Sequence, residues 1–382
     1  MSRDLLLVTI SLAIWGLGEG MFINFQPLYL QQLGADPLAI GAILGMAGAM
    51  MTVAQVPAGY LADRVGRRPL MWASWIFGAA AAWAMALATS LNVFVIGLLL
   101  YTLTSFVLAP MNSYITHARG KWSVGRALTF VSAMYNVGAV VGPLVGGFIG
   151  QRWGIQTIYL VAAVILAVST AIVLLVSPQP LDQHEEQHGR THLLRNTRFL
   201  MMLGVTFVAM FAMYLPQPFT PNFLQQQHSL SIESIGQLGS IGSLGNAGLM
   251  LMLGHLNAPL AFFIGQALVL IYSFLLWQSG GFVGFAGAYF ALGGYRLARS
   301  MLLAVGRSLV QYAEVGLAFG LIETVNGLAV MLAPMLAGWI FDRSPVQVYP
   351  VSLGLVLLSM LISGLYLRKH RAVPQYKEES AA

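Results

Sequence analysis

Long apolar stretches separated by short polar breaks run through the whole chain. Each stretch is about as long as the roughly 20 residues of helix that cross the hydrocarbon core of a bilayer. The stretches lack the alternation of apolar and polar residues that marks the strands of a membrane barrel. The pattern therefore predicts an all-α membrane protein with twelve membrane-spanning helices. Their expected bounds are residues 5–32, 38–60, 69–90, 92–117, 125–150, 155–177, 199–226, 231–254, 258–279, 281–307, 314–341 and 346–367.

One long polar break, Ser177 to Arg198, divides the predicted spans six and six. We therefore expect a six-helix bundle over residues 1–177 and a cytoplasmic linker over residues 178–198. A second six-helix bundle with a short cytoplasmic tail is expected over residues 199–382.

The second half repeats landmarks of the first. The segment "PLYLQQ" from Pro27 returns as "PNFLQQ" from Pro221. Parallel repeats of six helices are typical of transporters, whose solute site lies between the halves near the midplane. A second set of landmarks recurs in the same order: Gly125, Pro143, Gly147 and Arg152 return as Gly316, Pro334, Gly338 and Arg343.

Composition supports the membrane prediction. The chain is 58% hydrophobic and only 8% charged, whereas soluble domains carry about 25% charged residues. The absence of cysteine excludes disulfides and thiolate metal ligands. "HEEQH", residues 184–188, fits a zinc-binding pattern, but its position in the polar break favours a solvated linker. We expect no metal, no cofactor and no enzyme activity.

The net charge of +6 reflects topology rather than a nucleic-acid surface. Most Lys and Arg residues fall in the breaks on one side of the predicted spans, and basic residues accumulate on the cytoplasmic side of membrane proteins. We expect both termini in the cytoplasm, a multi-pass protein of the plasma (inner) membrane, contacts with membrane lipid and a monomer.

The break after the second predicted span carries a specific motif, "GYLADRVGRRPLM" over residues 59–71. It resembles the loop between spans two and three of the major facilitator superfamily, with the pattern G-x-L-x-D-R-x-G-R-[KR]. The resemblance implies the major facilitator fold, two six-helix pseudo-repeats that work by alternating access. It also implies a gate in which an acidic side chain meets a basic partner in one conformation. The gating residues implied are Gly59, Asp63, Arg64, Gly66, Arg67 and Arg68.

The fifth predicted span contains "GAVVGPLVGG", residues 138–147. It resembles the glycine-proline motif of the proton-coupled antiporters of the same superfamily, although Thr129 replaces an earlier glycine of that pattern. Close packing of helices on small residues is the alternative explanation. The motif residues are Gly138, Gly142, Pro143, Gly146 and Gly147.

Two arginines, Arg296 and Arg299, lie within the tenth predicted span. Arg296 is about 16 Å from the cytoplasmic end of that span, and a charge so deep must face protein or water. The deep acidic residues are Glu19 and Glu323. One hypothesis is a structural ion pair of Arg296 with Glu323. The other is that an arginine binds an acidic group of the solute while a glutamate, preferably Glu19, carries a proton.

Polar side chains within apolar spans complete the candidate binding and coupling set, since spans one, four, seven and ten line the cavity in the superfamily that this chain resembles. We expect a secondary transporter of a small organic solute, with proton-coupled efflux as the leading mode. An organic-anion importer or facilitator and a non-transporting receptor with the same fold are the alternatives. The additional candidates are Asn24, Gln26, Asn112, Tyr135, Asn136 and Asn326.

Overall fold

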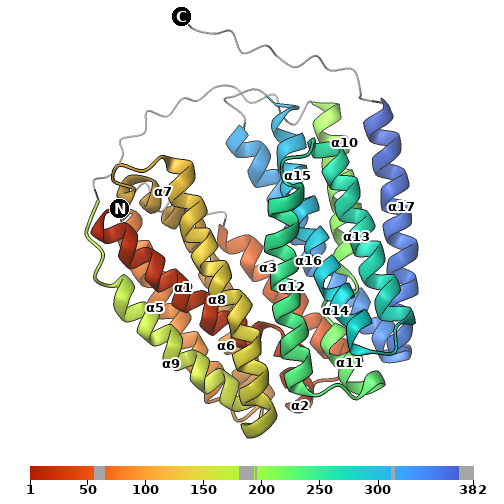
Figure 1. Cartoon of the computed structure of the whole chain (residues 1–382), viewed down its shortest axis with the longest axis horizontal. Helices are drawn as coiled ribbons and strands as arrows, with labels where there is room; N and C mark the ends of the chain where they lie inside the picture. The colour runs from red at the N-terminus through yellow and green to blue at the C-terminus, as the bar shows by residue number, and fades with distance from the viewer. Residues whose placement is uncertain (56–64, 180–192, 194–195, 311–314, 370–382) are drawn as a thin grey trace, which may run out of the picture.

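The computed structural model describes residues 1–55, 65–179, 193, 196–310 and 315–369, and every regular element within these ranges is helical (Figure 1). In the first half the elements are α1 (Arg3–Ile23), α2 (Gln26–Gln32), α3 (Pro37–Gln55), α5 (Arg67–Ala86), α6 (Leu91–Leu103), η1 (Thr104–Val107), α7 (Leu108–Ala118), α8 (Val124–Trp153) and α9 (Ile155–Val173). In the second half they are α10 (Thr197–Tyr214), α11 (Thr220–His228), α12 (Ile232–Leu253), α13 (Ala258–Gln278), α14 (Phe282–Ala291), α15 (Gly293–Arg307), α16 (Val315–Arg343), η4 (Pro345–Gln347) and α17 (Val348–Lys369).

Four predicted spans are broken into shorter helices, and the breaks follow the internal repeat. The first span is α1 followed by α2, and the seventh is α10 followed by α11. Pro27 and Pro221 stand in the first turns of α2 and α11, where a residue without an N–H is tolerated. The fourth span divides into α6, η1 and α7, and the tenth into α14 and α15. The spans expected to line the cavity are therefore the irregular ones.

Nine helices in the described ranges are long and apolar enough to cross a membrane, or ten if the bent pair over residues 91–107 and 110–118 is one span. The eighth and tenth predicted spans do not meet this test. In α12 the mean hydropathy is lowered by Gly, Ser, Gln and Asn residues, and α15 contains three arginines. The number of twelve spans remains a prediction, whereas the all-α membrane architecture is confirmed.

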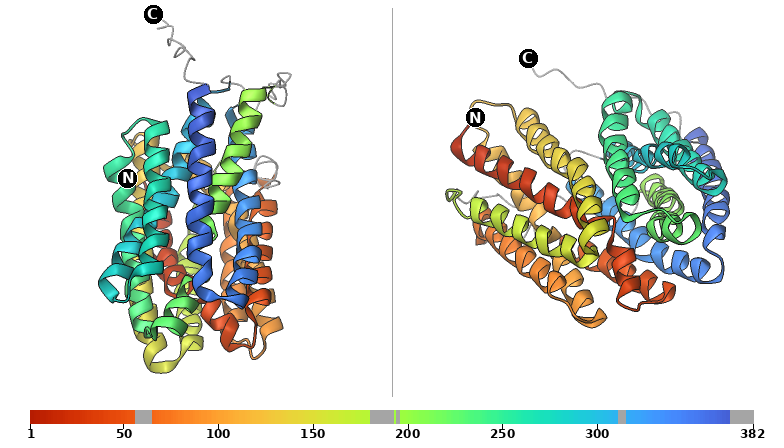
Figure 2. Two further views of the ribbon diagram at one scale, coloured as in Figure 1. Left: turned by 90° about the vertical axis from the view of Figure 1, so that its right-hand side faces the viewer. Right: turned by 60° about the horizontal axis from the view of Figure 1, so that its bottom comes forward.

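The helices form two groups that lie close together at one end and diverge towards the end that carries the N-terminus and the end of α17 (Figures 1 and 2). Helix α3 packs against α16, and α8 packs against α12. Glycines allow both contacts: Gly41 faces the carbonyl of Pro334, and Gly147 lies on Gly236.

Hydrogen bonds also join the two groups at the end opposite the N-terminus and the end of α17. The Asn222 side chain in α11 donates to the Pro27 carbonyl at 3.2 Å and to Gln31 Oε1 at 2.6 Å. The backbone N–H of Ile232 donates to Gln151 Oε1 at 3.0 Å. In this conformation, therefore, polar contacts hold α2 and α8 to α11 and α12.

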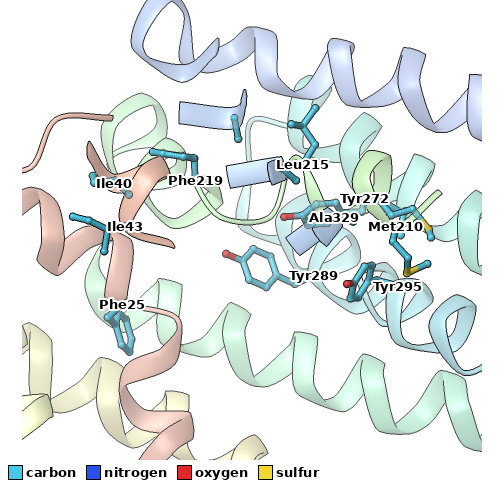
Figure 3. Packing of buried hydrophobic residues seen from close by; sticks show 14 of the residues in the cluster. Phe25, Ile40, Ile43, Met210, Leu215, Phe219, Tyr272, Tyr289, Tyr295 and Ala329 are labelled. Atoms are coloured by element: carbon cyan, nitrogen blue, oxygen red, sulfur yellow. The ribbon is translucent and has the colours of Figure 1, made fainter. Parts of the chain in front are cut away.

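One apolar core extends across both groups of helices (Figure 3). Phe25 and Ile40 come from the first half, and Phe219 comes from the second; all three are buried. Figure 3 also places Tyr289 and Tyr295 in this core. The core supports the broken spans on which the candidate site is built.

Candidate solute and proton site

Glu19 lies in α1, five residues before that helix ends at its C-cap, Asn24. The Tyr135 hydroxyl in α8 donates to Glu19 Oε2 at 2.8 Å. Gly16 permits this contact, because a methyl group there would overlap the Tyr135 carbonyl oxygen. Gly20, one turn further along α1, faces the Ala139 backbone. Small residues on α1 thus bring a carboxylate and a phenol from two helices together.

Tyr101, which the sequence pattern did not single out, lies beside this carboxylate and belongs to a cluster of aromatic rings. The rings of Trp15 and Tyr101 stack with centroids 6.1 Å apart, and Trp15 also contacts Trp75 at 5.4 Å. The buried Tyr101 hydroxyl lies beside Glu19, within electrostatic range of its carboxylate. Tyr101 is therefore a second phenol, besides Tyr135, next to this carboxylate. Aromatic residues are common in apolar spans, so nothing in their sequence pattern marked these rings.

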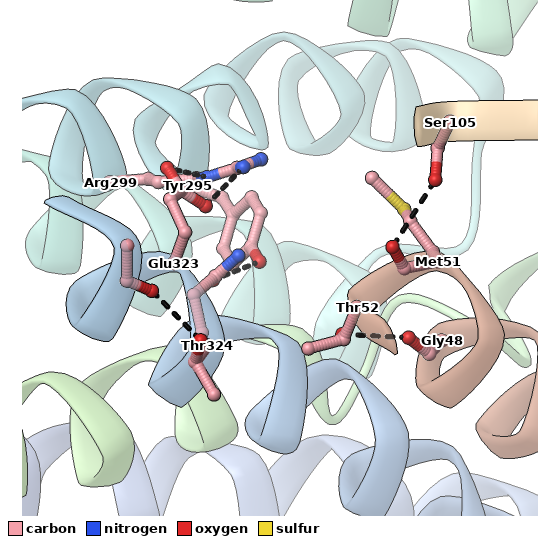
Figure 4. A network of polar contacts seen from close by, with 10 residues as sticks. Gly48, Met51, Thr52, Ser105, Tyr295, Arg299, Glu323 and Thr324 are labelled. Atoms are coloured by element: carbon pink, nitrogen blue, oxygen red, sulfur yellow. Dashed lines mark hydrogen bonds and ion pairs between the residues drawn. The ribbon is translucent and has the colours of Figure 1, made fainter. Parts of the chain in front are cut away.

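The ion pair of the second half involves Arg299 and not Arg296 (Figure 4). Arg299 donates through Nη2 to Glu323 Oε2 at 2.5 Å and through Nε to Oε1 at 3.3 Å. The hypothesis of a pair between Arg296 and Glu323 is therefore wrong. The two arginines are three residues apart, close to one helical turn, and the packing of α15 on α16 brings the second to Glu323.

A second polar contact joins α15 to α16 beside this ion pair. The buried Tyr295 hydroxyl donates to Asn326 Oδ1 at 3.1 Å, and the Tyr295 ring lies 5.7 Å from that of Tyr214 in α10. Asn326 is 5% exposed and is held between the helices rather than presented to solvent.

Arg296 is exposed and has no ion-pair partner within hydrogen-bonding distance among the residues that the structure describes. Arg296 lies within electrostatic range of Glu19 and Tyr135, on the other side of the boundary between the two halves. The structure thus separates the two arginines: Glu323 neutralises Arg299, whereas Arg296 stays outside that ion pair.

The sequence matches a known family: the model of the Major Facilitator Superfamily matches residues 8–310 of the chain. The chain belongs to this superfamily. The curated relatives that it matches include proteins named as a transporter, a transport protein or a multidrug resistance protein.

Individual relatives of the superfamily are distant. The multidrug resistance protein MdtG of Citrobacter koseri is 26% identical over 53% of this chain and 53% of its own length. An uncharacterized MFS-type transporter of Methanocaldococcus jannaschii is 28% identical over 37% of this chain and 36% of its own length. The matches thus span about a third to a half of these relatives. A crystal structure of a mutant nucleoside transporter NupG shares the fold, with a TM-score of 0.84, 14% identity, and coverage of 96% of this chain and 99% of NupG.

The superfamily loop is only partly described. Gly59, Asp63 and Arg64 lie outside the described residues. Gly66 has a φ of 92°, a conformation that favours glycine, and it immediately precedes α5. The first residues of α5 are basic: Arg67 donates to Gln179 Oε1 at 3.3 Å, and the Arg68 guanidinium lies 3.8 Å from the centre of the Trp72 ring.

The glycine-proline motif packs α8 against two helices at once. Gly138, Gly142 and Gly146 face the backbone of α1, where added methyl groups would overlap carbonyl oxygens of Ala13, Leu17 and Met21. Pro143 and Gly147 face α12 of the other half through Gly236. The motif therefore lies where α8 must approach both its own bundle and the opposite one.

The remaining candidate residues are not gathered at the carboxylate. The Asn136 side chain donates to its own helix at Ser132, at 2.8 Å. Asn112 is exposed on α7, and Gln26 is buried at the start of α2. Asn24 lies against Gly239 of α12, at the break in the first span. Among the described candidates, Glu19 and Tyr135 are hydrogen-bonded to each other and Arg296 is within electrostatic range of both, while Asn24 contacts the other half separately.

Proposed function

We propose that this protein exports a small organic solute in exchange for protons. The observation that carries the proposal is the hydrogen bond of Tyr135 to Glu19 in the first half, with Arg296 of the second half within electrostatic range of that carboxylate and outside the Arg299–Glu323 ion pair. A carboxylate and a cation on opposite halves of a transporter can change partners as the halves move.

Glu19 carries the proton in this proposal. In the charged state its carboxylate accepts the Tyr135 hydrogen bond and attracts Arg296. Protonation removes the negative charge and with it the attraction for the guanidinium. The proton on Glu19 and the solute on Arg296 thus act on one pair of side chains, and exchange requires that the bundles move with one of the two bound and not with both.

Alternating access follows from movement of one half against the other. We propose that residues 1–177 and 199–382 are the moving bundles, joined by the linker over residues 178–198. With both termini in the cytoplasm of an inner-membrane protein, the closed end at Asn222 and Gln31 faces outward. The conformation described here is then inward-facing, and opening to the outside requires these contacts to break.

Efflux is favoured over uptake on two grounds. The MdtG relatives are named multidrug resistance proteins, and the α8 motif resembles that of the antiporters. Import or facilitated diffusion of an organic anion is a second candidate, which the exposed Arg296 supports.

The test begins with purified protein screened for thermal stabilisation by a library of metabolites and drugs. Each stabilising compound is then measured for flux in proteoliposomes, with and without a pH gradient. Glu19→Gln should retain solute binding and lose flux driven by the gradient. Glu233→Gln, at the start of α12, is the matched control and should transport normally. Gradient-driven flux that is unchanged in Glu19→Gln would refute proton transfer at this residue.

A further inference from the structure

A groove lies on the outer side of the second half, between α10 and α17. Its volume is about 430 Å³, and its lining is almost wholly apolar. Figure 2 shows α17 in front, with the first part of α10 beside it, on the side of the molecule away from the other bundle. The residues that define this α10–α17 groove are Met201, Gly204, Val205, Val208, Ile362, Leu365 and Tyr366.

Gly204 forms an open part of the groove floor. A Cβ atom built on it meets no other atom within 4 Å, whereas glycines at the helix contacts of this protein meet backbone atoms. The space above Gly204 is therefore not needed for helix packing. It leaves a channel along the helices with room for a narrow, flexible apolar chain.

Basic side chains stand at the end of the groove nearest the termini. The Tyr366 hydroxyl donates to the Arg198 carbonyl at 3.0 Å, which places the start of α10 next to the last turns of α17. Arg198 precedes the groove residue Met201 by three positions, and Arg368 follows Leu365 by three, so each arginine continues the lining face of its helix. Both arginines are exposed.

We propose that the α10–α17 groove is a binding site for an acidic phospholipid. One acyl chain lies over Gly204 between Val208 and Ile362, and the phosphate lies between Arg198 and Arg368. An apolar channel that ends in two cations at the membrane surface complements an anionic amphiphile, and basic sites between transmembrane helices bind acidic headgroups. Tyr366 lies at the junction, where an aromatic ring with a polar tip suits the membrane interface.

The test is native mass spectrometry of the detergent-purified full chain titrated with phosphatidylglycerol or phosphatidylcholine of the same acyl chains. The wild type should bind the first phosphatidylglycerol more tightly than phosphatidylcholine. Arg198→Gln/Arg368→Gln should weaken phosphatidylglycerol binding by roughly tenfold or more and abolish the preference. Arg343→Gln, at the end of α16 opposite the termini, is the charge control and should leave both unchanged.

Gly204→Leu tests the apolar part of the site separately, because it fills the channel at a position where the fold leaves room. It should reduce binding of both lipids. Gly354→Leu, at another open position on α17, should not. Equal binding of the two lipids by the wild type would show ordinary boundary lipid and overturn the proposal. Unaltered phosphatidylglycerol binding by Gly204→Leu would overturn it as well.

Discussion

Glu323 in α16 holds Arg299 of α15 through two hydrogen bonds, the shorter of 2.5 Å, and Arg296 stays outside this pair. The side chains of Arg299 and Glu323 are 35% and 27% exposed, so the pair is neither fully solvated nor fully buried. Arg299 thus has a structural partner in Glu323. Arg296, which is outside this pair, is the arginine that we assign to solute binding.

This difference in pairing predicts that substitution of the two arginines changes the stability of the protein by different amounts. Arg299→Gln leaves Glu323 unpaired and should destabilise the protein by about 1–3 kcal/mol, between the values for exposed and buried pairs. Arg296→Gln should change stability much less and should impair solute binding instead. Thermal unfolding in detergent measures the first effect and ligand-induced stabilisation the second. Equal losses of stability in the two variants would contradict the assignment.

The contacts of Asn222 predict a latch at the end opposite the termini. Asn222→Ala removes the hydrogen bonds to Pro27 and Gln31 and should raise the population that is open at this end by about fivefold, the equivalent of about 1 kcal/mol. A single cysteine at position 26, which is 9% exposed in the wild type, should then react faster with a water-soluble maleimide.

Asn257→Ala is the matched control for the latch. The Asn257 side chain accepts a hydrogen bond from the Leu260 N–H at the start of α13, within one half. It should leave the reactivity of position 26 unchanged. If both asparagine variants accelerate labelling alike, loss of stability and not release of the latch is the cause.

Helix α8 allows a test of its glycine motif within a single helix. Gly146→Ala adds a methyl group against the Met21 backbone carbonyl and should destabilise the protein by about 1–3 kcal/mol. Gly125→Ala meets no neighbour within 4 Å and should be neutral or stabilise by up to about 1 kcal/mol. Thermal unfolding of both variants checks the difference; a similar response at the two positions would remove the packing role assigned to the motif.

Much of the helical architecture is predictable from the sequence because transmembrane helices must be long and apolar. The single-helix spans were placed within a few residues: α13 occupies Ala258–Gln278, where a span over 258–279 was expected. The breaks in the first and seventh spans were not predicted, although Pro27 and Pro221 were noted as a repeat. A hydropathy profile does not detect where one helix ends and the next begins inside an apolar stretch. A proline within the stretch does indicate such a break, because proline is tolerated in the first turn of a helix but not in its interior.

The partners of the charged residues were less predictable. Sequence spacing places Arg296 and Arg299 on one face of a helix but does not fix which of them reaches a glutamate on the next. That choice depends on how far α16 is shifted along α15, which is a property of packing. The bond between Glu19 and Tyr135 joins residues 116 positions apart and depends on the approach of α1 to α8. Both residues were candidates, but their contact was not inferred.

The last prediction concerns the orientation of the protein in the membrane. Single introduced cysteines can report this orientation, because the chain contains no cysteine of its own. Gln32 is exposed at the end of α2, beside the closed end of the molecule, and Lys121 is exposed between α7 and α8, at the end that carries the N-terminus (Figure 1). Basic residues concentrate on the predicted cytoplasmic side, so Gln32→Cys should react with an impermeant maleimide in intact cells. Lys121→Cys should react only after the membrane is permeabilised.

The labelling result also decides which conformation the structure represents. Reaction of Gln32→Cys from outside places the Asn222 latch on the extracellular side and makes this the inward-facing state. The reverse pattern would place the termini outside and make the same conformation outward-facing. Glu19 and Arg296 would then face the external solution first, and solute uptake would replace export as the mode that the arrangement supports. Labelling after denaturation of each variant checks that both cysteines are present and reactive, so that a lack of reaction in intact cells reports the side of the membrane.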